Sequence, residues 1–288
     1  MKRRAASILF LAVASAGPCS AGFRSADQGV LPGVGRTAGS FGSNWVTDLT
    51  IWNSGPVAAI VDLVFLPTGG VDNRQALQRV VEVGPISAGG TLLLPDVLLQ
   101  DFGQSAALGA MLYFGSRADA PALVAPLIVQ ARVHDSSAAG FGTIEPGSPY
   151  YDEAGPGAAT IGADILILPG LEESNDFRTN VGVWNGSDIS TSIVVAVDFF
   201  DSAGRAVGSM QASLPPLGHL QWNGALASLG ASGKGFSARA HLVSSTSNEA
   251  GPRPYFFAYA SVTNNHSNDP SYIEPAYQGE EPVDCIFP

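Results

Sequence analysis

The stretch Thr179-Asn180-Val181-Gly182-Val183-Trp184-Asn185 repeats a pattern that the chain first uses at Thr47-Asp48-Leu49-Thr50-Ile51-Trp52-Asn53. In both stretches every second residue is apolar, which is the periodicity of a half-buried β-strand. Each stretch ends at an Asn that is followed by Gly or by Ser-Gly, a combination that favours a turn. The sequence therefore predicts one strand-and-turn unit that is used twice.

Further matching stretches recur in the same order around these two strands. Three pairs stand out: Val30–Val34 with Ile167–Leu171, Val61–Pro67 with Val195–Asp201, and Ile144–Pro146 with Ile273–Pro275. The offset between copies is about the length of one ordinary domain and is too long for the common solenoid or propeller repeats. The pattern predicts that a whole domain was duplicated.

The chain between these anchors consists of short strand-like runs separated by turn residues. It contains 34 glycines and 20 prolines, which suits many tight connections. Six or seven short strands in each unit are typical of an antiparallel sandwich. We therefore expect an all-β fold, with two tandem antiparallel immunoglobulin-like β-sandwich domains related by internal duplication. Only two stretches, Pro95–Phe102 and Gly224–Leu229, resemble helical turns.

The predicted boundaries follow from composition. Residues 1–21 form a signal peptide, 22–146 the first sandwich, 147–162 a linker dense in Gly and Pro, 163–276 the second sandwich, and 277–288 a C-terminal tail.

The N-terminus has the features of an export signal. A basic start at Met1–Arg4 precedes a short apolar run and small residues, and we expect cleavage after Ala21, with Ala16 as the alternative. Lipidation of Cys19 is a less favoured alternative, because Pro18 stands where a small residue is expected. No later run is long enough to span a bilayer. These features predict a secreted, periplasmic or cell-surface protein.

The net charge restricts the expected classes of binding partner, and the cysteine content restricts the possible disulfide bonds. The formal charge is −11, and removing Lys2, Arg3 and Arg4 with the leader makes it −14. Such an acidic surface repels nucleic acid and anionic lipid, so the expected partner is a protein or a glycan outside the cell. Cys285 would then be the remaining cysteine, and it could pair with Cys19 only if cleavage falls at Ala16.

Three motifs carry a resemblance to a known group of proteins. They are Arg178–Asn185, the turn Asp201-Ser202-Ala203-Gly204 and the closing Asn268–Ile273. The chain resembles a family of uncharacterised exported bacterial proteins with tandem β-sandwich repeats. The resemblance implies a fold and an exported location, and it transfers no catalytic residue.

The sequence offers no convergent set of catalytic residues. His134, His219, His241 and His266 show neither helical i, i+4 spacing nor a zinc-binding arrangement. Asp135 follows His134 directly, and neighbours on a strand point to opposite faces, so we do not expect it to orient that ring. There is no Gly-x-Ser-x-Gly elbow. We therefore expect an exported, non-enzymatic structural or interaction protein.

Trp52 and Trp184 supply the first alternative function. They share strand parity with Asp48 and Asn180, opposite the apolar face of each strand. If that face is exposed, the tryptophans could stack on sugar, as in a carbohydrate-binding module. The competing interpretation is that each ring seals a sandwich edge or the contact between the domains.

The loop around Asn264, Asn265, Asn268 and Asp269 supplies the second alternative, a calcium-stabilised surface module. Calcium needs several oxygen ligands, and this loop is rich in them. However, it lacks the spacing of an EF-hand, and Asn and Asp also favour turns. No other cofactor is expected.

Overall fold

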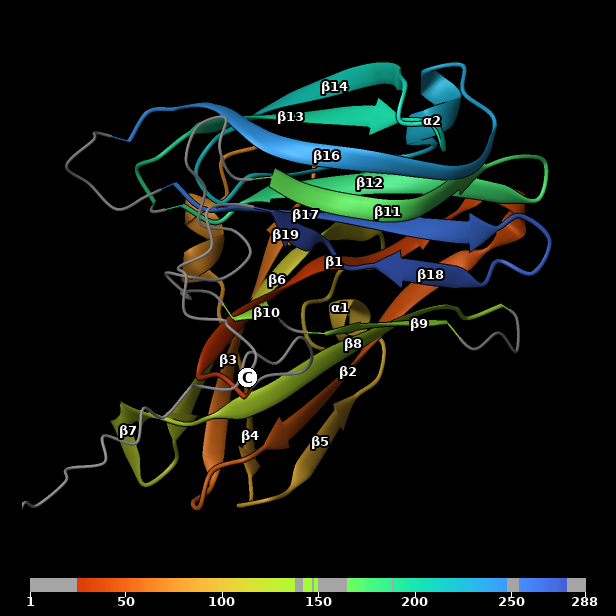
Figure 1. The fold of residues 1–288 in the computed structure, drawn as a ribbon. Helices are drawn as coiled ribbons and strands as arrows, with labels where there is room; N and C mark the ends of the chain where they lie inside the picture. The colour runs from red at the N-terminus through yellow and green to blue at the C-terminus, as the bar shows by residue number, and fades with distance from the viewer. Residues whose placement is uncertain are drawn as a thin grey trace, which may run out of the picture.

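A computed structural model describes residues 25–137, 142–146, 148–149, 165–187, 189–247 and 254–278. The fold is all-β and is built from several antiparallel sheets (Figure 1). In the part of the chain that is described, no helix has the length and apolarity needed to cross a membrane. The predicted leader with Cys19, most of the predicted linker and the tail with Cys285 lie outside the described residues.

The first half of the chain forms one ten-stranded sheet that is folded into two facing layers, which are joined where the end of β1 pairs with the start of β2. One has the strand order β4-β3-β6-β1, and the other contains β2, β5, β8 and β9, with β2 hydrogen-bonded to both β5 and β8. The strands are β1 Gln28–Ala38, β2 Asn44–Asn53, β3 Ala59–Pro67, β4 Val81–Ile86, β5 Thr91–Leu94, β6 Ala107–Arg117, β7 Ala120–Val124, β8 Leu127–Asp135, β9 Thr143–Pro146 and β10 Ser148–Pro149. Short helical turns lie at η1 Ser40–Gly42, η2 Arg74–Gln78 and α1 Val97–Gln100.

The second half repeats this strand order. Its sheets run β14-β13-β16-β11-β19 and β15-β12-β17-β18. The strands are β11 Ile165–Glu173, β12 Phe177–Asn185, β13 Ile193–Phe200, β14 Ala206–Leu214, β15 His219–Trp222, β16 Gly233–Ser245, β17 Phe256–Asn264, β18 Pro270–Ile273 and β19 Ala276–Gln278. One helical turn, α2 Ala225–Ser228, follows β15 as α1 follows β5, and this confirms both predicted helical turns.

Each half has its own core between its two layers. Leu49 and Ile51 of β2 point into the first core, and Val181 and Val183 of β12 point into the second, all with no exposed surface. The alternation of the two matching stretches therefore places the same residues inward, as predicted. The strand order differs from the ABED and CFG sheets of immunoglobulin constant domains, so the structure shows a two-sheet sandwich without that connectivity.

The Pro-Gly pair near the start of each half makes the same irregularity. In β1 the register with β6 shifts between Leu31 and Val34, and in β11 the register with β16 shifts between Leu168 and Leu171. A bulge lets two residues of one strand oppose one on its partner. All four flanking residues are fully buried in the cores, so the bulge keeps both ends of the strand pointing inward.

Asn53 and Asn185, the last residues of the two matching stretches, are buried anchors. The side-chain amide of Asn185 donates to the carbonyls of Thr191, Leu214 and Pro215, and its oxygen accepts from the Ser187 amide. Asn53 does the same with the carbonyls of Val57, Ile86 and Ser87 and the amide of Gly55. One side chain thus ties three chain segments together in each half.

The matching tripeptides Ile144–Pro146 and Ile273–Pro275 do not occupy equivalent places. Ile144 pairs with Arg132 and is 47% exposed, whereas Ile273 pairs with Ala260 and packs against the second core. Successive residues of a strand point to opposite faces, so a slip of one residue exchanges inside and outside. The prediction that these tripeptides are equivalent anchors is therefore wrong by one residue.

Two short strands lie partly or wholly outside the predicted sandwich ranges. β10 falls inside the range predicted as linker and pairs with β1, and β19 runs two residues past the predicted end of the second sandwich and pairs with β11. Both short strands extend the sheets at their edges.

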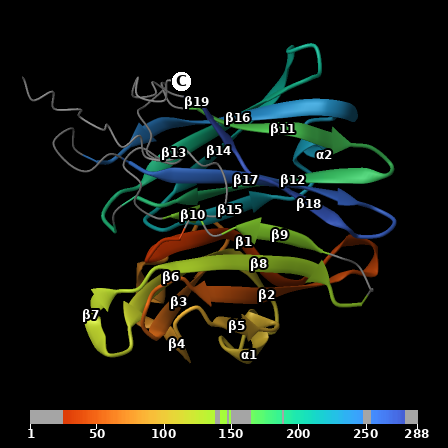
Figure 2. The same cartoon turned by 60° about the horizontal axis from the view of Figure 1, so that its bottom comes forward.

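The two halves pack face to face through a third apolar cluster (Figure 2). The outer face of the β12 sheet contributes Trp184, Phe257 and Tyr259, and these contact the outer face of the β3 sheet at Val64 and Leu112. Hydrogen bonds reinforce this contact. The amides of Gly69 and Gly70 donate to the His219 carbonyl, and Asn73 donates to the Leu217 carbonyl.

The corresponding outer face of the second half is charged. Val64 and Leu112 pair with each other in the first half, whereas Asp198 and Arg239 pair in the second. Arg239 lies over the Phe200 ring, and Asp198 lies 3.6 Å from His241. The apolar pair is covered by the other half and the charged pair faces outward.

Candidate binding groove between the two halves

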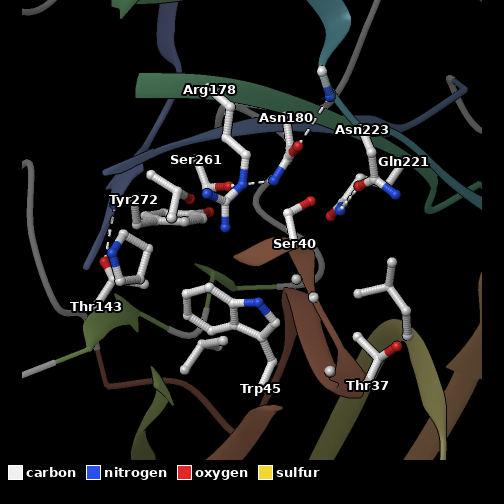
Figure 3. A pocket seen from close by; sticks show the side chains of 18 of the residues that line it. Thr37, Ser40, Trp45, Thr143, Arg178, Asn180, Gln221, Asn223, Ser261 and Tyr272 are labelled. Atoms are coloured by element: carbon white, nitrogen blue, oxygen red, sulfur yellow. Dashed lines mark hydrogen bonds between the residues drawn. The ribbon is translucent and has the colours of Figure 1, made fainter. Parts of the chain in front are cut away.

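A groove of about 670 Å³ lies beside the apolar contact, where the two halves diverge. Strands β1 and β2 and the turn between them form one wall, and the outer face of the β12 sheet forms the other (Figure 3). The volume falls within the range of small-molecule sites. The groove is therefore taken as the candidate site.

Trp45 forms the aromatic surface of the first wall. It stands at the start of β2, is half-buried, and directs its indole toward the opposite wall (Figure 3). The preceding turn allows this position, because a β-carbon on Gly39 would lie 2.2 Å from Trp45 Nε1. Glycine at position 39 therefore keeps the ring in place, and Ser40 adds a hydroxyl beside it.

The second wall is polar because the outer positions of four neighbouring strands carry polar side chains. Asn180 of β12 is opposite Ser261 of β17, which is opposite Tyr272 of β18. Gly182 is opposite both Tyr259 and Gln221. A β-carbon at Gly182 would lie 2.2 Å from the Tyr259 ring, so glycine lets this ring lie across the strand.

Hydrogen bonds fix these side chains. Asn180 accepts from the Gly224 amide at 3.1 Å and donates to Ser261 Oγ at 3.3 Å. The Tyr259 hydroxyl donates to Gln221 Oε1 at 2.7 Å, and Gln221 Nε2 donates to Asn223 Oδ1 at 2.7 Å. The wall is therefore organised before any ligand binds, which lowers the entropic cost of binding.

Two charged residues of opposite sign line the groove. Partial burial lowers the pKa of the Arg178 guanidinium, and the charge of Glu173 partly offsets this effect. Partial burial raises the pKa of Glu173, while hydrogen bonds from the amides of Thr179 and Ala227 lower it. Together the two residues leave the lining close to neutral.

His219 is fully buried behind Tyr259, which lines the groove, and is structural. Its Nε2 is 3.1 Å from the Tyr259 hydroxyl, and the two rings stack. Burial lowers the pKa of His219 from 6.5 to about 3, and the Pro32 backbone opposes this only in part. The ring is therefore neutral in the folded protein at neutral pH.

We expect acid to destabilise the fold through His219. The unfolded chain binds a proton below pH 6.5 and the folded chain only below about pH 3. The stability from a neutral His219 is therefore complete above pH 6.5 and falls as the pH drops through this window. The free energy of unfolding should be about 2 kcal/mol lower at pH 5 than at pH 7 from this residue. Urea unfolding at both pH values measures it. His219→Gln should remove this part of the difference, and an unchanged pH dependence in that variant would refute the assignment.

The structure separates the two tryptophans that the sequence treats alike. Trp52 is 40% exposed on the outer face of the first half, and its Nε1 donates to the Gly89 carbonyl. Trp184 has no exposed surface and lies in the contact between the halves. The prediction that both could present a ring to a sugar is therefore wrong for Trp184. Neither ring lines the groove.

Asp48 and Asn180 occupy equivalent places but differ in surroundings. Asp48 accepts from the Asp96 amide, as Asn180 accepts from Gly224, so each fixes the turn before a short helix. Asp48 also lies 3.1 Å from His134 Nε2. Only Asn180 lines the groove. Asp135 binds Asn44 and Ser137, so it does not orient His134, as expected.

The oxygen-rich loop directs its side chains toward protein donors. Asn265 and Asn268 accept from Arg178, and Asn264 accepts from the amides of His266 and Ser267. The Asp269 amide is held by Ser267. These contacts account for the Asn side chains, because Asn264 stabilises the turn and Asn265 and Asn268 position Arg178. Within the described residues, no group of three His, Cys, Asp or Glu side chains is placed to hold a metal. Calcium binding stays a prediction.

Most of the groove residues were not singled out in the sequence. Trp45, Arg178, Gln221, Asn223 and Tyr272 come from segments more than 200 residues apart at the extremes. One signal was available, because Arg178 shares strand parity with Asn180. The parity shows a common face but not which surface lies opposite.

Comparisons with known proteins add little to this picture. No family model matches the chain, and no curated protein matches it. Among solved structures, a lectin from Pleurotus ostreatus in complex with GalNAc has a TM-score of 0.21 and 11% identity, covering 88% of this chain and 86% of the lectin. The apo form of Pleurotus ostreatus lectin has a TM-score of 0.18 and 12% identity, covering 88% and 84%. At such TM-scores neither fold nor ligand is transferred.

Proposed function

We propose that the chain is an exported, non-enzymatic binding protein and that its ligand is a carbohydrate held in the groove between the two halves. The observation that carries the proposal is the composition of the groove, where the Trp45 ring faces a wall of amide and hydroxyl side chains. The exported location rests on the signal-peptide features of residues 1–21.

The two walls suit the two surfaces of a sugar. A pyranose ring has an apolar face of C–H groups, which packs on a flat aromatic ring such as that of Trp45. Its edge carries oxygens, which need hydrogen-bond partners when they leave water. Asn180, Gln221 and Asn223 carry amides suited to this role. A mostly preformed pocket with a few fixed polar groups is the usual form of a small-ligand site.

The lining favours binding over hydrolysis. A glycosidase generally uses two carboxyl groups on either side of the scissile bond. Glu173 is the one carboxylate among the described residues that line the groove. This is our reason for proposing a binding protein. The second candidate function is the binding of a protein partner through the outer faces.

We further propose that the two halves descend from one duplicated unit. The matching strand order, the bulge at the Pro-Gly pair and the equivalent anchors Asn53 and Asn185 support this. Under this proposal the groove is a feature of the pair, because a single unit contributes only one wall.

A glycan array with the mature protein tests the proposed function. We expect binding that Trp45→Ala lowers at least about fivefold, since loss of a stacked ring costs on the order of 1–3 kcal/mol. Trp52→Ala is the matched control, because its ring lies outside the groove. The two variants must retain the far-ultraviolet spectrum of the parent and a cooperative unfolding transition.

The reverse pattern, with binding lost in Trp52→Ala and kept in Trp45→Ala, would move the site to the outer face of the first half. Binding to no glycan would refute a carbohydrate ligand.

A further inference from the structure

The hydrogen-bond donors that the second wall presents to the groove indicate what kind of ligand would bind there. Asn180 Oδ1 is turned toward the Gly224 amide, which can only donate. This contact fixes the orientation of the side-chain amide. One N–H of Asn180 reaches Ser261, and the second N–H remains for a ligand. Asn180 therefore offers the groove a donor.

The side-chain oxygens of Gln221 and Asn223 also point toward protein donors. Gln221 Oε1 accepts from Tyr259, and Asn223 Oδ1 accepts from Gln221. The side-chain NH₂ of Asn223, an exposed residue, is thus left on the groove side of this chain of hydrogen bonds.

Arg178 is also a hydrogen-bond donor on this wall. Its guanidinium has only donors, and the oxygens of Asn265 and Asn268 hold it at the groove (Figure 3). The side-chain oxygens of the four amide residues that line this wall are thus turned toward protein donors, while N–H groups of Asn180 and Asn223 line the space that a ligand would occupy.

We propose that the groove selects a sugar that carries an oxygen able only to accept hydrogen bonds, such as the carbonyl of an N-acetyl group or a carboxylate. This inference rests on the proposed function. A hydroxyl group accepts but also brings a proton that needs its own acceptor, and the amide oxygens of this wall already accept from protein donors. A carbonyl oxygen brings no proton. Between the two sources, the opposite charges of Arg178 and Glu173 and the acidic chain favour the uncharged acyl group.

Six small ligands test the inference directly. They are the methyl glycosides of the unsubstituted sugar, the 2-acetamido sugar and the uronic acid, each in the gluco and the galacto configuration. Within each configuration only one substituent changes. Calorimetric titration of the mature protein should show at least about tenfold tighter binding of the acetamido sugar than of the unsubstituted one, the scale of one or two hydrogen bonds.

Isosteric variants identify the atoms. Asn180→Asp and Asn223→Asp keep an oxygen for Gly224 and Gln221 and replace the donor on the groove side with an acceptor. Each should lower the preference for the acetamido sugar by about fivefold or more. Asn223→Asp changes an exposed residue, so folding should be unaffected. Asp48→Asn, at the place equivalent to Asn180 but outside the groove, should leave the preference unchanged.

Each outcome has one meaning. If a uronic acid binds most tightly and its binding weakens with added salt, the acceptor-only site is supported and the acceptor oxygen is that of a carboxylate. Equal binding of substituted and unsubstituted sugars, or a preference that survives both Asp variants, overturns the inference and leaves carbohydrate binding intact. Binding of none of the six sugars, together with a blank glycan array, overturns the proposed function as well.

Discussion

Replacement of Trp184 by alanine should lower the free energy of unfolding by about 3–5 kcal/mol, whereas Trp52→Ala should lower it by no more than about 2 kcal/mol. The two tryptophans are the penultimate residues of matching strands, and Trp52 is 40% exposed whereas Trp184 is 0% exposed. Trp184→Ala would open a cavity in the apolar cluster between the halves, next to Leu112 and Phe257. Trp52→Ala removes a partly hydrated ring and one hydrogen bond to the Gly89 carbonyl.

Urea unfolding followed by circular dichroism measures both variants. If Trp184→Ala does not fold, Trp184→Phe supplies a smaller loss, which should still exceed that of Trp52→Phe. Equal losses at the two positions would show that the contact between the halves does not contribute to stability in solution.

The second large effect concerns the buried asparagines. Asn185→Ala should destabilise the protein by about 3–5 kcal/mol, because three carbonyls and one amide lose their partner while remaining away from water. Asn53→Ala removes the same set of contacts in the first half and should cost a similar amount.

Asn223→Ala is the matched control for these two variants. Its side chain is exposed, so the free energy of unfolding should stay within about 0.5 kcal/mol of the parent value. Asn185→Asp is informative too, because it keeps the acceptor for Ser187 and removes the donors. A loss below about 1 kcal/mol in Asn185→Ala would mean that the three carbonyls find other partners.

Local features of the fold were predictable because they depend on near neighbours in the chain. The alternation of Leu49 with Ile51, and of Val181 with Val183, fixes which face of each strand is apolar. The two helical turns followed from short apolar spacings after a turn residue. Where a contact distant in sequence intervened, prediction failed. The run Leu77–Val83 has the composition of one strand, yet it begins within η2, and β4 starts only at Val81, while Leu77 packs against the contact between the halves.

The candidate site was less predictable than the fold. Asn180 and Asn265 were singled out, and both line the groove, but for reasons of sugar stacking and calcium that the structure does not display. Trp45 gave no signal, since one tryptophan at the start of a strand is ordinary. The groove needs two surfaces, and the opposition of Trp45 to Asn180 depends on how the halves pack.

The sequence alone determined that this protein is built of β-strands, which residues of each strand face a core, and where the chain turns. Only the tertiary structure decided which outer faces meet, and therefore that Trp184 is buried while Trp52 is exposed. The physical reason is that a strand's inward face is set by its own alternation, whereas the fate of its outward face depends on a partner surface. Val64 and Leu112 supply an apolar partner for Trp184, and in the second half the corresponding positions hold the charges of Asp198 and Arg239.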